Sequence, residues 1–541
     1  NARSVIAKIY LASLLSQTAT TLDEKRSQLH ARLASVSRDR TLIEPLMEEM
    51  LTSKAAYVGP IRQQLRPYSG ELTDRLWAVL RDPTANSERR FRAAIALADY
   101  VPESQVSLWS ADDLTLVARQ LVTANAESQP TLRETLRPLH QQILPELASI
   151  FADTKATDAQ RLGAANAFAD YATNDIEKLT ELLTIATPEQ YAVLFPIVSA
   201  SPTPTTIADL GKIVAVQPEE DMDTLSRVPF GQRRANAAAT LLRMGEREMI
   251  FPLFEMTDDP EALTQFIFRC RPRGVGVEAL LDCFQLVCTA PMDRYPKHAR
   301  FAILLGLAEF DLAEIPETRR EALLTQLIAM YANDPSSGVH GAAGWLLRQW
   351  GQADAVAKID QTPKPFSNDR EWFTLAIEVK PTIDWQSNGV PRDTKKKKFF
   401  YTFVVFPAGE YKIGSLADEP GRSKIETRHE VQLTRPYAIL NREITWEELV
   451  AFESRYAGFM NNSSGQPTDA GAGVDWYDAV GFCRWLGRHS GLSEAEQAYP
   501  DPKKLDEEDY PREPNPIANG APRDWPLDLE RPGFRLPTEA E

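Results

Sequence analysis

Apolar residues recur at helical spacing through most of the first two thirds of the chain. The recurring unit has a basic residue, small or apolar residues three and four positions later, and a large apolar residue seven positions later. That spacing places all four on one helix face. The small pair lets a neighbouring helix approach closely, so the pattern predicts stacked helices. The five copies of this unit begin at Arg90, Arg161, Arg234, His298 and His340.

A longer internal repeat encloses the first two copies. Residues 61–100 align without a gap with residues 132–171, and the identities include Arg62/Arg133, Asp82/Asp153, Arg90/Arg161, Asp99/Asp170 and Tyr100/Tyr171. An aspartate turn precedes three of the copies, at Asp82, Asp153 and Asp334. Two helices joined by such a turn are typical of a helical solenoid.

This arrangement resembles HEAT and HEAT-like repeats, which stack units of roughly forty residues. The resemblance implies a HEAT-like α-solenoid over residues 1–355, and it places Asp82, Arg90, Asp153, Arg161 and Arg234 in a structural ladder between successive units. The last units have His298 and His340 instead of arginine. We expect these to be packed or ladder histidines, because no nucleophile or acid partner shares their motif.

Residues 356–398 contain several prolines among scattered aromatic residues, which predicts a linker at a domain boundary. Beyond it the hydrophobic period becomes alternating. The alternation predicts strands joined by tight turns over residues 399–406, 410–415 and 429–440.

Two helices are predicted after these strands. Thr445 and Glu448 have the spacing of a capping box, and residues 475–489 place Cys483 on an apolar helix face. Thr538 is placed to cap a further helix that would begin at Glu539.

Five ordered motifs of this region, FPAGEYKIGS, HEVQLTRPYAI, REITWEELVAF, VDWYDAVGFCRWL and FRLPTEAE, resemble the formylglycine-generating enzyme or sulfatase-modifying factor family. The resemblance implies a C-type-lectin-like α+β fold over residues 399–541. In the family the last motif lies mid-domain, so we expect an incomplete domain here. The motif residues expected to have structural roles are Gly414, Glu443, Thr445, Trp476, Ala479, Arg535, Leu536, Pro537, Thr538 and Glu539.

Because lectin-like folds pair early strands with late ones, the incomplete domain has two expected consequences. We expect the strand near Phe403 to expose an apolar edge. We also expect the last forty or so residues to be loosely held.

The family resemblance also implies a chemistry. Formylglycine-generating members oxidise a substrate cysteine with oxygen, using two cysteines that bind copper, and that pair follows the last motif. We therefore expect no catalytic, cofactor or metal residue in this chain, with copper and calcium possible only in a complete domain. Cys483 is not expected to substitute, because a single buried thiol has no resolving partner.

The succession of a HEAT-like array and such a domain resembles the C-terminal halves of large bacterial serine/threonine protein kinases, notably of planctomycete type. A kinase would then precede Asn1, since this chain holds no kinase motif. The favoured hypothesis is a non-catalytic interaction or scaffold region of a signalling protein. The alternative is a copper-dependent formylglycine-generating oxidase whose catalytic cysteines lie beyond Glu541.

The net charge, the cysteines and the apolar runs of the sequence limit the partners and the compartment that we expect. The formal net charge of −16 disfavours nucleic acid, so we expect a protein partner on the solenoid. Four irregularly spaced cysteines and the lack of a long apolar run predict a cytoplasmic chain without a membrane span, although an anchor outside these residues stays open. We interpret the basic run 395–398 as a solvated strand end and the acidic run 506–509 as a solvated loop.

Overall fold

The computed structural model describes residues 2–53, 55–219, 222–257, 259–291, 294–379, 396–501, 504 and 525–541. The chain divides into two compact units. One comprises Asn1–Glu219, Arg227–Leu253 and Thr257–Ala279, and the other comprises Glu220–Ser226, Phe254–Met256 and Leu280–Glu541.

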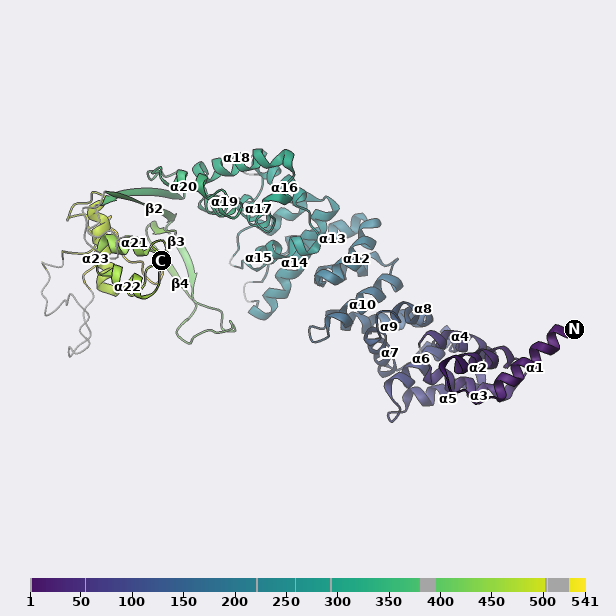
Figure 1. Cartoon of the computed structure of the whole chain (residues 1–541). Helices are drawn as coiled ribbons and strands as arrows, with labels where there is room; N and C mark the ends of the chain where they lie inside the picture. The colour runs from purple at the N-terminus through teal and green to yellow at the C-terminus, as the bar shows by residue number, and fades with distance from the viewer. Residues whose placement is uncertain are drawn as a thin grey trace, which may run out of the picture. The chain divides into compact units, whose positions relative to one another are not determined.

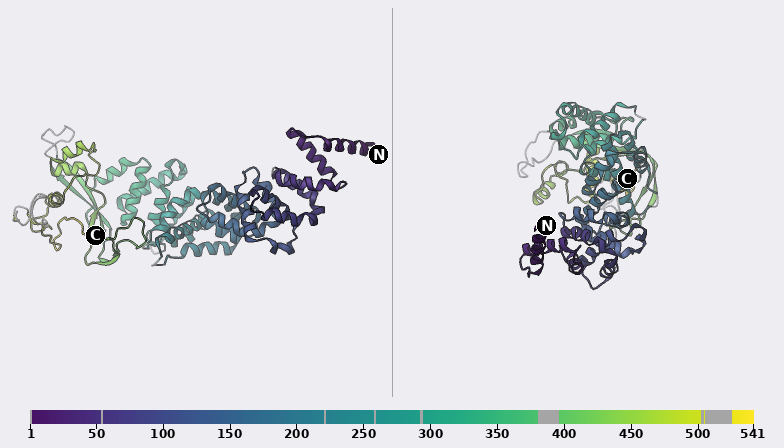
Figure 2. Two further views of the ribbon diagram at one scale, coloured as in Figure 1. Left: turned by 90° about the horizontal axis from the view of Figure 1, so that it is seen from below. Right: turned by 90° about the vertical axis from the view of Figure 1, so that its right-hand side faces the viewer.

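The first unit consists of helices, and helices joined by short turns pack against each other (Figures 1 and 2). Its elements are α1 (Ala2–Ser16), α2 (Leu22–Ser35), α3 (Ile43–Thr52), α4 (Ala55–Leu65), α5 (Ser69–Arg81), α6 (Ser87–Tyr100), α7 (Ala111–Thr123), α8 (Gln129–Leu136), α9 (His140–Ala152), α10 (Asp158–Tyr171), α11 (Ile176–Ile185), α12 (Pro188–Ala200), α13 (Pro204–Ala215), most of α14 (Thr224–Met244), α15 (Glu261–Cys270) and the short 3-10 helix η6 (Arg271–Arg273). The predicted solenoid-like helical architecture is confirmed.

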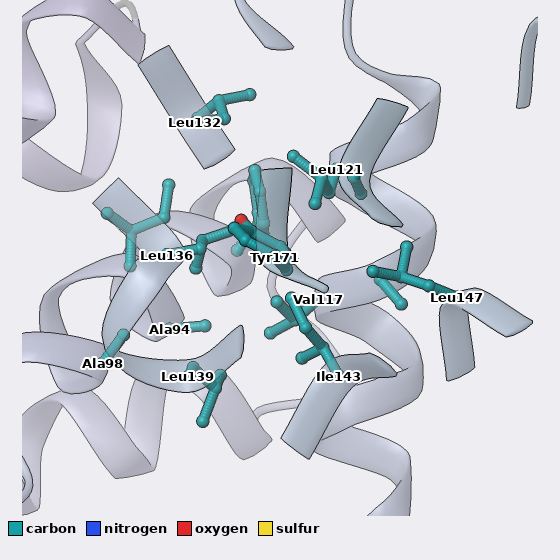
Figure 3. Close-up of a cluster of buried hydrophobic side chains, with 14 of the residues drawn as sticks. Ala94, Ala98, Val117, Leu121, Leu132, Leu136, Leu139, Ile143, Leu147 and Tyr171 are labelled. Atoms are coloured by element: carbon teal, nitrogen blue, oxygen red, sulfur yellow. The ribbon is translucent and has the colours of Figure 1, made fainter. Parts of the chain in front are cut away.

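The core of this unit follows the repeat pattern. Figure 3 shows Ala94 and Ala98 of α6, Val117 and Leu121 of α7, and Tyr171 of α10 converging with leucines of α8 and α9. The paired alanines of the first three copies have no exposed surface, as close helix approach requires. These alanines are Ala93, Ala94, Ala164, Ala165, Ala237 and Ala238.

The two aligned segments repeat their contacts as well as their residues. The Tyr100 hydroxyl donates to the carbonyl of Arg62 at 2.8 Å, and Tyr171 donates to the carbonyl of Arg133 at 2.8 Å. Burial raises the pKa of both tyrosines, so both hydroxyls keep their protons. The internal repeat is therefore a repeat of three-dimensional structure.

The second unit joins helices to a strand-containing domain (Figure 1). Its elements are most of α16 (Val277–Thr289), α17 (Ala299–Leu307), α18 (Glu317–Asn333), α19 (Ser337–Gln349), α20 (Ala353–Asp360), β1 (Trp372–Val379), β2 (Lys397–Phe406), β3 (Gly409–Ile413), β4 (His429–Leu433), β5 (Tyr437–Leu440), α21 (Trp446–Phe452), α22 (Tyr456–Asn462) and α23 (Trp476–His489).

The strands form two antiparallel sheets among the described residues, a three-stranded sheet in the order β1-β2-β5 and a two-stranded sheet of β3 and β4. Phe403 lies on the central strand and is paired with Phe373 on one side and Leu440 on the other. The prediction that the strand near Phe403 exposes an edge is wrong. Its partner β1 comes from the segment expected to be a linker, where the alternation of residues 372–379 is free of proline.

One face of the larger sheet builds the domain core. Phe399, Tyr401 and Phe403 of β2 are buried there, while the residues between them are more exposed. These side chains pack with Leu449 of α21 and Trp485 of α23. The period-two pattern thus sets which face the helices cover.

Residues 525–541 are attached to this core. Trp525 is buried, the ring of Phe534 lies 5.8 Å from that of Phe403, and Arg435 pairs with Glu530 at 2.6 Å. For these seventeen residues the prediction of a loosely held segment is wrong, because aromatic side chains anchor them. The backbone after Pro537 makes a turn, closed by the Glu541 N–H donating to the Thr538 carbonyl at 3.2 Å, where we expected the start of a helix.

Candidate functional site

The arginines expected in a ladder bind the ends of preceding helices. Arg90 Nε donates to the Leu80 carbonyl at 2.7 Å, Arg161 Nε to Phe151 at 3.4 Å and Arg234 Nη2 to Val214 at 2.9 Å. Each acceptor lies at the C-terminal end of a helix, where a positive charge offsets the helix dipole. The repeated arginine therefore fastens the two helices of its own pair.

The aspartates of the turns also bind backbone. The N–H of Thr84 donates to Asp82 Oδ1 at 2.8 Å, and that of Lys155 donates to Asp153 Oδ1 at 2.8 Å. Asp334 repeats the contact with Ser336 at 3.0 Å. Within the described residues no ion pair joins an aspartate to the arginine of its own copy, so the ladder contacts run to backbone groups instead.

The two histidines of the last copies differ in their surroundings. His340 is 7% exposed, and its Nδ1 is 2.7 Å from the Tyr331 carbonyl at the end of α18. It thus takes the position that arginine has in earlier copies. His298, half-buried, immediately precedes α17. The interpretation of His340 as a packed histidine is confirmed.

Among the motif residues of the C-terminal domain, Gly414 lies in a turn and Thr445 lies at the start of a helix. Gly414 has φ +91°, and a Cβ there would lie 2.5 Å from the Thr427 carbonyl, so only glycine fits. The Thr445 N–H donates to Glu448 Oε2 at 2.7 Å, which confirms the predicted capping box. Arg442 adds two bonds to the buried Glu448 carboxylate, at 2.6 and 2.9 Å, whereas the Glu443 side chain is exposed.

An aromatic cluster forms around the start of α23, comprising Trp476, Tyr477, Tyr499 and Trp525. The ring centroid of Trp476 lies 5.2, 6.3 and 6.1 Å from those of Tyr477, Tyr499 and Trp525, each in an edge-on arrangement. Tyr499 and Trp525 are buried, whereas Trp476 and Tyr477 are half-exposed, as is Ala479 one turn along α23. Val474 beside them is exposed.

Cys483 lies beneath the aromatic cluster. Its thiol packs with Val480, Tyr499 and Trp525. Burial raises the pKa of Cys483 to about 12, so the thiol is protonated at neutral pH. The predicted helix-core position of Cys483 is confirmed.

The last motif closes over the same cluster. Leu536 packs against it, and the Leu536 N–H donates to the Tyr499 hydroxyl at 3.4 Å. Arg535 Nη1 donates to Glu541 Oε2 at 2.5 Å, and this bond lowers the pKa of Glu541 to about 2. Pro537, Thr538 and Glu539 have exposed side chains.

The geometry of the aromatic cluster is better suited to packing against a ligand than to a reaction of the Cys483 thiol. The half-exposed rings of Trp476 and Tyr477 offer an apolar surface with polar edges, on which a ring or an aliphatic side chain can pack. The nearby thiol is protonated and covered. We expected a structural role for Trp476, and no periodic signal could have shown that its ring is only half-buried.

Two charged runs were also singled out in the sequence. Lys396 pairs with Glu378 at 2.6 Å across the β1–β2 pair and Lys397 pairs with Glu447, which fits a strand end. Lys395 and the acidic run 506–509 lie outside the described residues.

Residues 390–541 match a family model described as the sulfatase-modifying factor enzyme 1-like domain. The C-terminal part is a sulfatase-modifying factor-like domain. A search of curated proteins gave no match. Among solved structures, a crystal structure of a Kap121p mutant is 15% identical with a TM-score of 0.25, and the match covers 65% of this chain and 42% of that one.

The family resemblance implies a copper ion, which needs suitable ligands among the residues of the sulfatase-modifying factor-like domain. Copper is selected by soft thiolate ligands, whereas Cys483 is a buried thiol that is protonated at neutral pH. In the described parts of the chain, no group of three or more histidine, cysteine, aspartate or glutamate side chains could hold a metal ion. The described residues therefore do not fit a copper site.

No helix within the described ranges combines the length and the apolar character needed to cross a bilayer.

Proposed function

We propose that this chain is a non-catalytic interaction region of a larger bacterial signalling protein, in which helical repeats bind a protein partner and the sulfatase-modifying factor-like domain binds a ligand or protein. One observation carries the proposal. In the matched domain the single cysteine is a protonated core residue, while the rings of Trp476 and Tyr477 above it are half-exposed. The resemblance of the domain order to planctomycete-type kinases supports a kinase-linked, cytoplasmic setting.

An experiment with two arms tests this proposal. In the first, the purified chain is incubated with copper, oxygen and a cysteine-containing peptide, and mass spectrometry follows the peptide. We expect the peptide cysteine to remain intact. In the second, partners are cross-linked to the chain in a lysate of its host and the cross-linked positions are mapped.

For the second arm, we expect Trp476→Ala to remove cross-links to the C-terminal domain and to leave those on the helical repeats. Val474→Ala, an exposed neighbour outside the aromatic cluster, serves as the matched control. Circular dichroism of both variants checks that they fold. Formation of formylglycine by the chain alone would overturn the proposal.

The family match favours a second candidate, a copper-dependent formylglycine-generating oxidase. Its catalytic cysteines would have to come from outside the described residues, because Cys483 does not fit the role. The first arm of the experiment, repeated with a longer product of the same gene, separates the two candidates.

A further inference from the structure

The first unit contains three neighbouring arginines that form no ion pair within the described part of the chain. Arg243 lies near the end of α14, Arg269 lies on α15 and Arg273 lies on η6. No carboxylate of the described residues lies within 4.0 Å of their guanidinium nitrogens, whereas many arginines elsewhere in this unit form ion pairs. We refer to these three residues as the arginine cluster.

Hydrogen bonds connect the members of the arginine cluster. Arg243 Nη1 donates to the Arg273 carbonyl at 2.9 Å, and Arg273 Nη2 donates to the Ala186 carbonyl at 2.8 Å. Asn236 also donates to the Ala186 carbonyl, at 3.2 Å, and its Oδ1 lies 3.5 Å from Arg269 Nη1. The three side chains therefore meet around the C-terminal end of α11.

Their charge is only partly compensated. Arg273 is 3% exposed, and its Nε has no hydrogen-bond partner. Burial, and then the nearby Arg269, lower the pKa of Arg273 to about 10, so it remains charged at neutral pH. The end of α11 supplies a dipole equivalent to about half an elementary charge. Glu261 acts on Arg269 and Glu189 acts on Arg273 without forming an ion pair with it, so the positive charge of the cluster is offset only in part.

Aromatic and apolar groups accompany these charges. The Arg243 guanidinium lies 3.5 Å from the ring centroid of Phe195, with Tyr191 also beneath it. Two residues adjacent in sequence to members or contacts of the cluster have large apolar side chains that face solvent. Phe268, which precedes Arg269, is 62% exposed, and Ile185, which precedes Ala186, is 44% exposed.

We propose that the arginine cluster binds a carboxylate of an acidic protein segment, with Phe268 and Ile185 contacting an apolar side chain of the same segment. Arginine binds carboxylates through two parallel bonds, and the partial burial of this cluster strengthens them. The net charge of −16 makes this cationic site a local exception and opposes nucleic acid as its ligand. The inference rests on the proposed function, because it names the chemistry of the partner.

Fluorescence anisotropy with a labelled peptide, Glu-Glu-Phe-Glu-Glu, tests this assignment on the whole chain. We expect binding that weakens as salt is raised and that is about tenfold weaker for the matched Gln-Gln-Phe-Gln-Gln peptide. Arg269→Gln should weaken binding about tenfold, and Phe268→Ser by a smaller factor. The control is Arg119→Gln, which changes an exposed arginine of α7 that forms no ion pair within the described residues, and it should leave binding unchanged.

Arg269→Lys distinguishes an effect of the lost charge from an effect of misfolding. It keeps the positive charge, so it should retain part of the affinity that is lost in the glutamine variant. Equal binding of both peptides, or equal loss in the Arg119 variant, would overturn the inference. So would binding of inorganic phosphate that depends on Arg269 in the absence of peptide binding. If the peptide fails to bind while partners still cross-link to the repeats, this inference falls and the proposed function stands.

Discussion

The imidazole of His340 stacks on the indole of Trp372, with ring centroids 3.9 Å apart and planes inclined by 20°. Tyr331 stacks on the other face of His340 at 4.4 Å. The Trp372 Nε1 donates to the Asp334 carbonyl at 2.8 Å. Strand β1 is thereby fixed to the α18–α19 pair, and the sulfatase-modifying factor-like domain is joined to these helices by packed aromatic rings.

Trp372→Phe should destabilise the second unit. The substitution keeps an aromatic ring but removes the indole N–H, leaving the Asp334 carbonyl without that donor, and the expected cost is about 1–2 kcal/mol. Urea denaturation monitored by circular dichroism measures the change. Trp345→Phe on α19, where the side chain is 41% exposed, should change stability by less than about 0.5 kcal/mol. Equal effects of the two substitutions would contradict the role of the stack.

The stack should also make stability depend on pH. Burial lowers the pKa of His340 below its ordinary value of 6.5, although the nearby Tyr331 carbonyl, Asp360 and Asp334 act in the opposite direction and Arg348 acts with burial. The unfolded chain therefore binds a proton more readily, so the contribution is fully present above pH 6.5 and decreases as pH falls below it.

The midpoint of urea unfolding, measured between pH 7.5 and 5.5, should fall less in His340→Asn than in the unsubstituted chain. A midpoint that rises on acidification in the unsubstituted chain, and not in the variant, would show that protonation stabilises the stack.

Two glycines of α19 form a matched pair. A Cβ at Gly344 would lie 2.4 Å from the Tyr331 ring, whereas a Cβ at Gly341 meets nothing within 4 Å. Gly344→Ala should destabilise by about 1–3 kcal/mol through overpacking. Gly341→Ala should stabilise by about 0.5–1 kcal/mol through helix propensity. Thermal unfolding of both variants tests the small-residue rule of the repeat, and similar shifts would refute it.

The repeated tyrosines should contribute similarly to stability. Tyr100→Phe and Tyr171→Phe each remove one hydrogen bond to an arginine carbonyl, so each should cost about 1 kcal/mol. Because they belong to different copies of the repeat, the double variant should cost about the sum. Urea unfolding of the four proteins gives these differences. A negligible cost for one site would show that the two copies are not equivalent.

Cys483 should resist thiol reagents in the folded chain. Its thiol is buried and protonated at neutral pH, so alkylation by iodoacetamide should proceed far more slowly than that of free glutathione. Mass spectrometry of digested protein locates the label, and the same reaction in urea provides the reactive control. Labelling of Cys483 in the folded chain at the rate of glutathione would revive a chemical role for it.

Several elements were determined by the sequence itself. The spacing of Arg90, Ala93, Ala94 and Leu97 specified a buried helix face, and the Thr445–Glu448 pair specified a helix start, because both depend on residues within two helical turns. Alternation likewise specified β2. Such local patterns were sufficient to predict the mainly helical architecture and the small C-terminal domain that follows it.

Only the tertiary structure decided which groups meet. The sequence could not show that the repeated arginines bind helix ends, that β1 joins the sheet beside β2, or that Trp476 is half-exposed above Cys483. The three residues of the arginine cluster come from α14, α15 and η6, and their convergence at the end of α11 follows from packing of side chains far apart along the chain. The burial of Arg273, and the lack of an ion pair to these arginines within the described residues, are properties of that packing, and no local pattern encodes them.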